Sequence, residues 1–173
     1  MTKRELAHHI YQRAHLEGMF TLRSGIKSRE YFDKYLFESD PELLSEIGRH
    51  MTPLLPDSVD VLAGLELGGI PLAVTVSQMT GTPLRFVRKQ AKSYGTEKLA
   101  EGGSVSGRRV VIVEDVITSG GQVIESVAYL RQEGAIIDTV LCVINREEGG
   151  EEALETHGLI MKSLFTMSEL KSN

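Results

Sequence analysis

The stretch from residue 110 to residue 122 constrains the fold of this chain more than any other. Four apolar residues, Val110 to Val113, lead directly into the acids Glu114 and Asp115. Consecutive apolar residues are typical of a strand that is covered on both faces, as in a parallel sheet. The small residues that follow predict a turn into a helix. The segment therefore predicts a strand–turn–helix unit with two acids at the carboxyl end of the strand, where open parallel sheets bind ligands.

The turn itself predicts a site for one phosphate group. Its residues are Thr118, Ser119, Gly120, Gly121 and Gln122. Small side chains let the backbone N–H groups close around an anion, and the helix N-terminus adds about half a positive charge. The turn lacks the Gly-Lys-Ser/Thr ending of a triphosphate P-loop and the glycine fingerprint of a dinucleotide-binding domain. The two acids would repel phosphate, so they fit sugar hydroxyls or a cationic transition state, or they are solvated acids that cap the helix.

Strands and helices alternate along the rest of the chain. Strands are expected at 59–63, 84–87, 110–113 and 136–144, and helices at 3–17, 41–52, 70–79 and 122–133. Short extended pieces are expected between residues 19 and 33. This alternation predicts an α/β fold with a parallel sheet and helices on both faces. Residues 90–108 show no clear period, and a loop of that length is usually a lid or disordered.

Length and composition narrow the class of protein. The 173 residues predict one domain. Neither an apolar run of about 18 residues nor an apolar signal core is present, so we expect a cytoplasmic chain without a membrane partner. The net charge of −5 argues against nucleic-acid binding. Cys142 lies in an apolar run and is expected to be a buried thiol, and the five histidines lack ligand spacing, so no dedicated protein metal site is expected.

Residues 110–122 closely resemble the 5-phosphoribosyl 1-diphosphate (PRPP) binding motif of the type I phosphoribosyltransferases. Three further segments resemble the orotate members of that family. They are Phe20-Thr21-Leu22-Arg23-Ser24-Gly25-Ile26-Lys27-Ser28 with Tyr31-Phe32-Asp33, then Arg88-Lys89-Gln90-Ala91-Lys92-Ser93-Tyr94-Gly95, and finally Ile144-Asn145-Arg146. With residues 64–71, the resemblance spans nearly the whole chain in order. It implies the type I phosphoribosyltransferase fold in a single domain, 1–173, with residues 1–40 contributing to a hood and 90–108 forming a mobile active-site loop.

The resemblance also implies a role for each matching residue. PRPP would contact Arg88, Lys89, Lys92, Tyr94, Glu114, Asp115, Val116, Ile117, Thr118, Ser119, Gly120, Gly121 and Gln122. Orotate would contact Thr118, Arg146, Arg23, Lys27, Tyr31 and Phe32. Lys92, Glu114 and Asp115 are the expected catalytic residues. The two acids would hold the ribose hydroxyls, residues 118–122 the 5-phosphate, and the cations at 88, 89 and 92 the diphosphate.

The sequence departs from the family pattern at three positions. Tyr94 stands where many relatives have histidine, and Arg23 where some have lysine, so the division of roles between Arg23 and Lys27 is open. Gly68 stands where some relatives have a lysine that binds the diphosphate. The diphosphate site is therefore expected to depend more on the loop.

The implied activity is orotate phosphoribosyltransfer, which converts PRPP and orotate into orotidine 5′-phosphate and diphosphate during UMP synthesis. Mg²⁺ would be carried by PRPP, with help from Glu114 and Asp115. A homodimer that shares loop residues across its interface is also implied. The alternatives are a phosphoribosyltransferase for another base and a non-catalytic PRPP-sensing regulator. Without the resemblance, the cations at 88, 89 and 92 could be a solvated cluster, and Arg146 could pair with Glu147 or Glu148.

Overall fold

A six-stranded sheet forms the centre of the structure, a computed structural model that describes residues 1–22, 25–90 and 99–172. The strands are β3 (Val61–Leu65), β4 (Leu84–Val87), β5 (Ala100–Glu101), β6 (Arg109–Ile117), β7 (Ile136–Asn145) and β8 (Ile160–Thr166). Their order is β5-β4-β3-β6-β7-β8. Neighbouring strands are parallel except for β4 and β5, which are antiparallel. The predicted α/β class with a mostly parallel sheet is confirmed.

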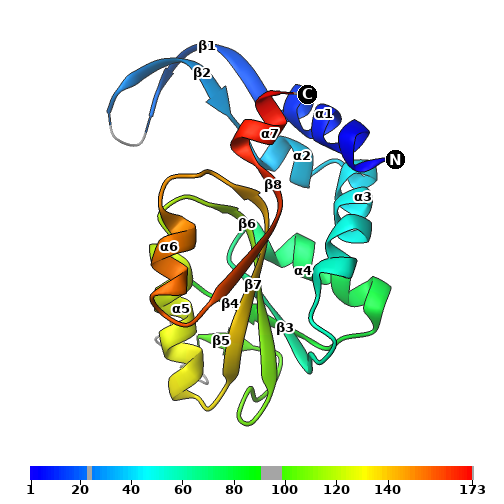
Figure 1. Cartoon of the computed structure of the whole chain (residues 1–173), viewed down its shortest axis with the longest axis vertical. Helices are drawn as coiled ribbons and strands as arrows, with labels where there is room; N and C mark the ends of the chain where they lie inside the picture. Colours follow the sequence, from blue (N-terminus) through cyan, green and yellow to red (C-terminus); the bar gives the residue numbers. More distant parts are fainter. Residues whose placement is uncertain (23–24, 91–98, 173) are drawn as a thin grey trace.

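Helices cover both faces of the sheet, and each face has its own hydrophobic core. The helices α3 (Pro41–Met51) and α4 (Gly69–Thr80) lie on one side, with the 3-10 turn η1 (Thr52–Leu54), and α5 (Gly121–Gln132) and α6 (Gly150–Glu155) lie on the other (Figure 1). The predicted start of α3 is confirmed, because the Asp40 carboxylate accepts the N–H groups of Glu42 and Leu43. None of the described helices combines the length and apolar character needed to cross a membrane.

A smaller layer forms a hood over one end of the sheet (Figure 1). It consists of α1 (Lys3–Ala14), the hairpin of β1 (His15–Thr21) and β2 (Lys27–Phe32), α2 (Tyr35–Glu38) and the C-terminal α7 (Met167–Lys171). The helix expected at 3–17 ends at residue 14, because residues 15–17 pair with residues 30–32 of β2. The C-terminal helix was not predicted, and it adds a distant part of the chain to the hood.

The loop expected at residues 90–108 is shorter in the structure. Residues 91–98 lie outside the described residues. Beyond them, Leu99, Ala100 and Val105 are buried in the core, and β5 pairs with β4. The Arg85 guanidinium also donates to the carbonyl groups of Gly103 and Ser104. The second half of the expected loop therefore belongs to the packed domain, since its few apolar residues are enough to anchor it.

Candidate active site

Glu114 and Asp115 lie inside β6, which continues four residues beyond its expected end at Val113. Asp115 is 0% exposed and Glu114 is 8% exposed. The Asp115 N–H donates to Oε1 of Glu114 at 3.0 Å, and the Val116 N–H donates to the Asp115 carboxylate. These acids are therefore not solvated helix caps. They are buried groups at the carboxyl end of the sheet.

The turn after β6 leaves the start of α5 open. Gly120 has a φ of +77°, and no side chain caps the helix. Thr118 and Ser119 are exposed at the turn. On the far side, a Cβ atom on Gly150 would lie 2.5 Å from the carbonyl oxygen of Thr118, so α6 packs directly against the turn. The uncapped N–H groups of the first helical turn make this a site that favours an anion.

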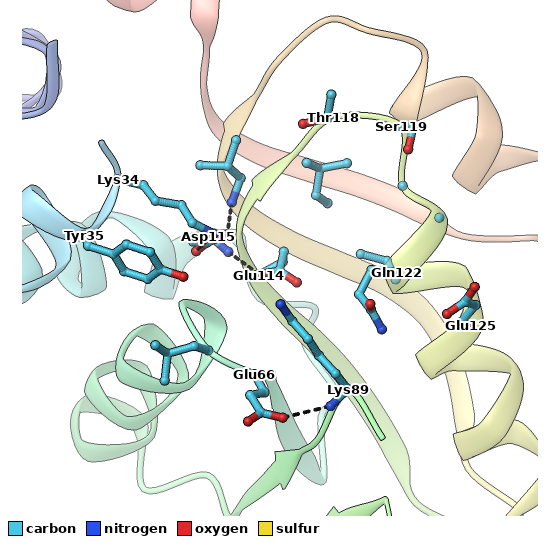
Figure 2. A pocket seen from close by; sticks show the side chains of 16 residues that line it. Lys34, Tyr35, Glu66, Lys89, Glu114, Asp115, Thr118, Ser119, Gln122 and Glu125 are labelled. Atoms are coloured by element: carbon cyan, nitrogen blue, oxygen red, sulfur yellow. Dashed lines mark hydrogen bonds and ion pairs between the residues drawn. The ribbon is translucent and has the colours of Figure 1, made fainter. Parts of the chain in front are cut away.

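A cavity of about 480 Å³ joins the turn to the acids (Figure 2). Its lining residues are Lys34, Tyr35, Glu66, Leu67, Lys89, Glu114, Asp115, Val116, Ile117, Thr118, Ser119, Gly120, Gly121, Gln122, Val123 and Glu125. We call it the donor cavity. Two lysines enter it from opposite walls: Lys34 from the hood and Lys89 from the end of β4. The Lys89 N–H donates to the Glu66 carboxylate at 2.9 Å, which fixes the backbone beside the cavity.

Three buried carboxyl groups and one lysine cluster beside the donor cavity: Glu114, Asp115 and Lys34 line it, and Glu38 lies next to Asp115. The Lys34 ammonium forms an ion pair with Oδ2 of Asp115, and Glu38 of α2 packs against the same carboxylate. Burial raises the pKa of Glu38 to about 9, with Asp115 adding to the effect. Burial and the Asp115 charge also raise the pKa of Glu114. Burial opposes ionisation of Asp115, but hydrogen bonding to Glu114 and the Lys34 charge lower its pKa. Of the three carboxyl groups, Asp115 is therefore the ionised one, opposite Lys34.

Gly68 allows this cluster to form. A Cβ atom at this position would lie 1.6 Å from Oδ2 of Asp115 and 2.9 Å from Oε1 of Glu38. At Gly69, a Cβ atom would lie 2.2 Å from the carbonyl oxygen of Val113. The turn after β3 thus packs tightly against β6. A lysine of the kind that some relatives have at position 68 has no room in this arrangement.

A second cavity, of about 310 Å³, lies under the hood. Its lining residues are Tyr11, His15, Leu22, Ser28, Glu30, Tyr31, Phe32, Arg146, Met167 and Lys171. We call it the base cavity, because it brings together Tyr31, Phe32 and Arg146 from the predicted orotate set. The same short segment then contributes Lys34 and Tyr35 to the donor cavity. One stretch of five residues therefore borders both cavities.

The other predicted site residues differ in whether they line a cavity. Lys27 is exposed at the start of β2 and lines neither cavity. Arg88 pairs with Glu101, 3.5 Å from Nε to Oε1, and does not line the donor cavity. Arg146 pairs with Glu148 at 3.3 Å, as the surface alternative anticipated, although it also lines the base cavity. Arg23, Lys92 and Tyr94 lie outside the described residues.

Sequence reasoning missed Lys34 and Glu38. Lys34 is the N-cap residue of α2 and Glu38 is its last residue, and this helix of four residues has no clear pattern. Both side chains meet a strand that lies about 80 residues further along the chain. A charged residue next to a loop normally remains in solvent. The only local signal was their position directly after the Tyr31-Phe32-Asp33 segment.

Known proteins similar to this chain point to one family. The phosphoribosyl transferase domain matches residues 41–160. An orotate phosphoribosyltransferase of a Nocardioides species is 55% identical over 155 residues, which is 90% of this chain and 87% of the relative. Its counterpart in Methanocella arvoryzae is 46% identical over 153 residues, 88% of this chain and 87% of the relative.

Solved structures agree with these relatives. The crystal structure of Mycobacterium tuberculosis orotate phosphoribosyltransferase in complex with PRPP matches at a TM-score of 0.84 and 30% identity. The match covers 98% of each chain, so it includes the hood as well as the sheet. The chain therefore belongs to the orotate phosphoribosyltransferases, a family of pentosyltransferases.

Proposed function

We propose that this chain transfers the ribose 5-phosphate unit of PRPP to orotate, giving orotidine 5′-phosphate and diphosphate. One observation supports this most directly: the uncapped start of α5 and the buried acids Glu114 and Asp115 line the same cavity. The start of α5 would bind an anion, and the two acids would accept hydrogen bonds from hydroxyl groups. A sugar phosphate presents both kinds of group, so residues 118–122 would hold the 5-phosphate and the acids the ribose hydroxyls.

The charges that surround the donor cavity suit the transfer. Breaking the bond between ribose and diphosphate leaves positive charge on the sugar and negative charge on the leaving group. The acids would lie beside the sugar, and Lys89, with Arg88 and Lys92, would meet the diphosphate. Such preorganised charge is usually the largest catalytic term, and losing one contact costs about 3–4 kcal/mol.

Orotate would occupy the base cavity. Its carboxylate suits the Arg146 guanidinium, which can donate two parallel hydrogen bonds. Glu148, the present partner of Arg146, is an exposed carboxylate, so exchanging it for orotate costs little. The rings of Tyr31 and Phe32 would pack against the base, and Thr118 lies at the donor-cavity wall, where it could contact orotate beside the ribose.

Mg²⁺ fits this arrangement as an ion that enters with PRPP. Within residues 1–22, 25–90 and 99–172, no three His, Cys, Asp or Glu side chains are arranged so that they could hold a metal ion. The donor cavity instead presents two adjacent carboxyl groups, at Glu114 and Asp115. Mg²⁺ commonly binds through substrate phosphates and one or two carboxylates. The bound ion would neutralise charge on the diphosphate.

A homodimer with shared active sites completes the proposal. Arg88 does not line the donor cavity of its own chain and pairs with Glu101, so it would meet the diphosphate of a neighbouring subunit by exchanging that partner. Lys92 would reach the same neighbour, and the first half of the expected loop, residues 90–98, would act as a lid that keeps water from the cationic sugar. The enzyme would be a single domain, 1–173, with residues 1–40 in its hood. It would act in the cytoplasm on small molecules, without nucleic acid or membrane.

The reaction is tested by following orotate consumption with PRPP and Mg²⁺. Adenine, hypoxanthine and uracil are compared under the same conditions. Of the four bases, we expect only orotate to be turned over. Turnover with a purine in place of orotate would contradict the proposal, and tight PRPP binding without any turnover would favour the regulator.

The shared active site is tested by mixing two inactive variants. Lys92→Ala would remove the lid cation, and Asp115→Asn would remove the ribose contact. If the lid serves the partner, each hybrid dimer has one intact site, and random mixing restores about a quarter of wild-type activity. If the lid serves its own chain, no hybrid site is intact and the mixture remains inactive.

A further inference from the structure

Lys34 is the one described residue of the donor cavity that brings a positive charge from the hood to the buried acids. We infer that Lys34 is a positioning residue, which holds the Asp115 carboxylate in the orientation that receives the ribose of the donor. This inference rests on the proposed function, because it assigns the ribose to Asp115. It adds a residue outside the predicted site and gives the hood a part in binding the donor.

The contacts of Asp115 carry the inference. One carboxylate oxygen accepts the backbone N–H of Val116, and the other meets the Lys34 ammonium. The carboxylate is thus fixed at one end by its own strand and at the other end by the hood. Its side chain is 1% exposed, so water contributes little to its orientation.

The surroundings of Asp115 make Lys34 necessary. Glu114 lies beside it on β6, and Glu38 approaches from α2, so the neighbouring ionisable side chains include two further carboxyl groups. Lys89 lines the opposite wall of the cavity (Figure 2). A buried carboxylate that loses its paired cation is strongly disfavoured, and it becomes protonated or turns away. In either case the ribose would lose a fixed acceptor.

The packing of the cavity explains why the cation comes from the hood. On the side of β3, Gly68 leaves no space between its backbone and Asp115. The hood side is open to a long side chain, and Lys34 reaches across it from the start of α2. The Lys34 ammonium also lies 5.2 Å from the centre of the Tyr35 ring, which further restricts its position.

Ligand binding to the purified protein tests the inference. Affinities for ribose 5-phosphate, PRPP and inorganic diphosphate are measured by calorimetry for the wild type, Lys34→Met and the control Lys3→Met, in which an exposed lysine is replaced. We expect Lys34→Met to lose about tenfold or more in affinity for the two ligands that contain ribose. Inorganic diphosphate should bind as to the wild type. An equal loss for diphosphate would mean that Lys34 contacts the leaving group itself, and unchanged binding of all three would overturn the inference.

A double-mutant cycle separates positioning from a general structural effect. If Lys34 acts through Asp115, Lys34→Met adds no further loss of ribose 5-phosphate affinity to Asp115→Asn. Lys34→Arg, which keeps the charge, should restore most of the binding and keeps the test valid if Lys34→Met does not fold. Additive losses, or no rescue by arginine, would contradict the inference. If the wild type did not consume orotate, the proposed function would be wrong. The inference on Lys34 would still be tested separately, because ribose 5-phosphate binding does not depend on the base.

Discussion

Replacing Gly68 with alanine is the sharpest test of the packing around Asp115. The added Cβ atom would lie 1.6 Å from the Asp115 carboxylate, whereas ordinary van der Waals contact begins at 3.4 Å. The carboxylate must therefore move by about 2 Å, or the turn after β3 must shift. Because Asp115 is buried and bound to Lys34 and the Val116 N–H, moving it breaks contacts at both oxygens.

Two magnitudes follow from this displacement. Overpacking of a well-packed interior costs about 1–3 kcal/mol of stability. For a chain of this length, each kcal/mol lowers the melting temperature by about 2–4 °C. Loss of a fixed contact to the transition state lowers turnover by about 10²–10³-fold. We therefore expect Gly68→Ala to fold with a lowered melting temperature and to lose most of its kcat/KM for PRPP.

Differential scanning calorimetry and the orotate-consumption assay measure the two effects on the same preparation. Gly121→Ala serves as the thermal control, because its Cβ atom would meet only the Ser119 hydroxyl, at 3.9 Å. A Gly68→Ala variant with the melting temperature and kcat/KM of the wild type would refute the close approach of Gly68 to Asp115.

Three further predictions concern other parts of the molecule. Arg146→Ala should weaken orotate much more than PRPP in binding measurements, and equal losses would contradict its assignment to the base cavity. Gly150→Ala should lower phosphate affinity several-fold, because the Cβ atom would press on the Thr118 carbonyl at 2.5 Å; unchanged phosphate titrations would argue that the turn adapts freely. The folded-state pKa of Glu38 is raised from 4.5 to about 9, so folding binds a proton and stability falls as pH rises between these values. In urea unfolding from pH 5 to pH 8, Glu38→Gln should reduce the fall in the free energy of unfolding by at most about 1.4 kcal/mol per pH unit. Equal pH slopes in the wild type and the variant would rule out Glu38 as the source of the decline.

Much of the fold could be predicted from local pattern. The strand expected at 84–87 matches β4, and the helix expected at 70–79 matches α4 within one residue at each end. The strands at the centre of the sheet are buried on both faces along most of their length, so their sequences contain runs of consecutive apolar residues, such as Val110 to Val113. β8 was missed because it lies at the edge of the sheet and its residues alternate irregularly between buried and exposed. β5 has only two residues, too few for any period.

The candidate site also has a part that the local sequence predicts and a part that only the folded structure reveals. The turn at residues 118–122 and its neighbouring acids form one continuous segment, and the sequence alone indicated their grouping. Lys34 meets Asp115 only because the hood folds over the end of the sheet, a contact that no local pattern encodes. Lys27 was expected at the orotate site, but its side chain on β2 is exposed and does not line the base cavity. Side chains alternate along a strand, so Lys27 points away from the face of its neighbour Ser28, which does line that cavity.

The stretch from Tyr31 to Tyr35 has a consequence for attempts to redesign this enzyme. Its first two residues border the base cavity and its last two border the donor cavity, with a single residue between them. A backbone adjustment that admits a bulkier acceptor would shift the lysine that faces Asp115 by a comparable amount. Broadening acceptor choice and preserving affinity for the sugar donor are thus opposing demands on one short peptide, and variants selected for a new base need compensating changes in β6 or α2.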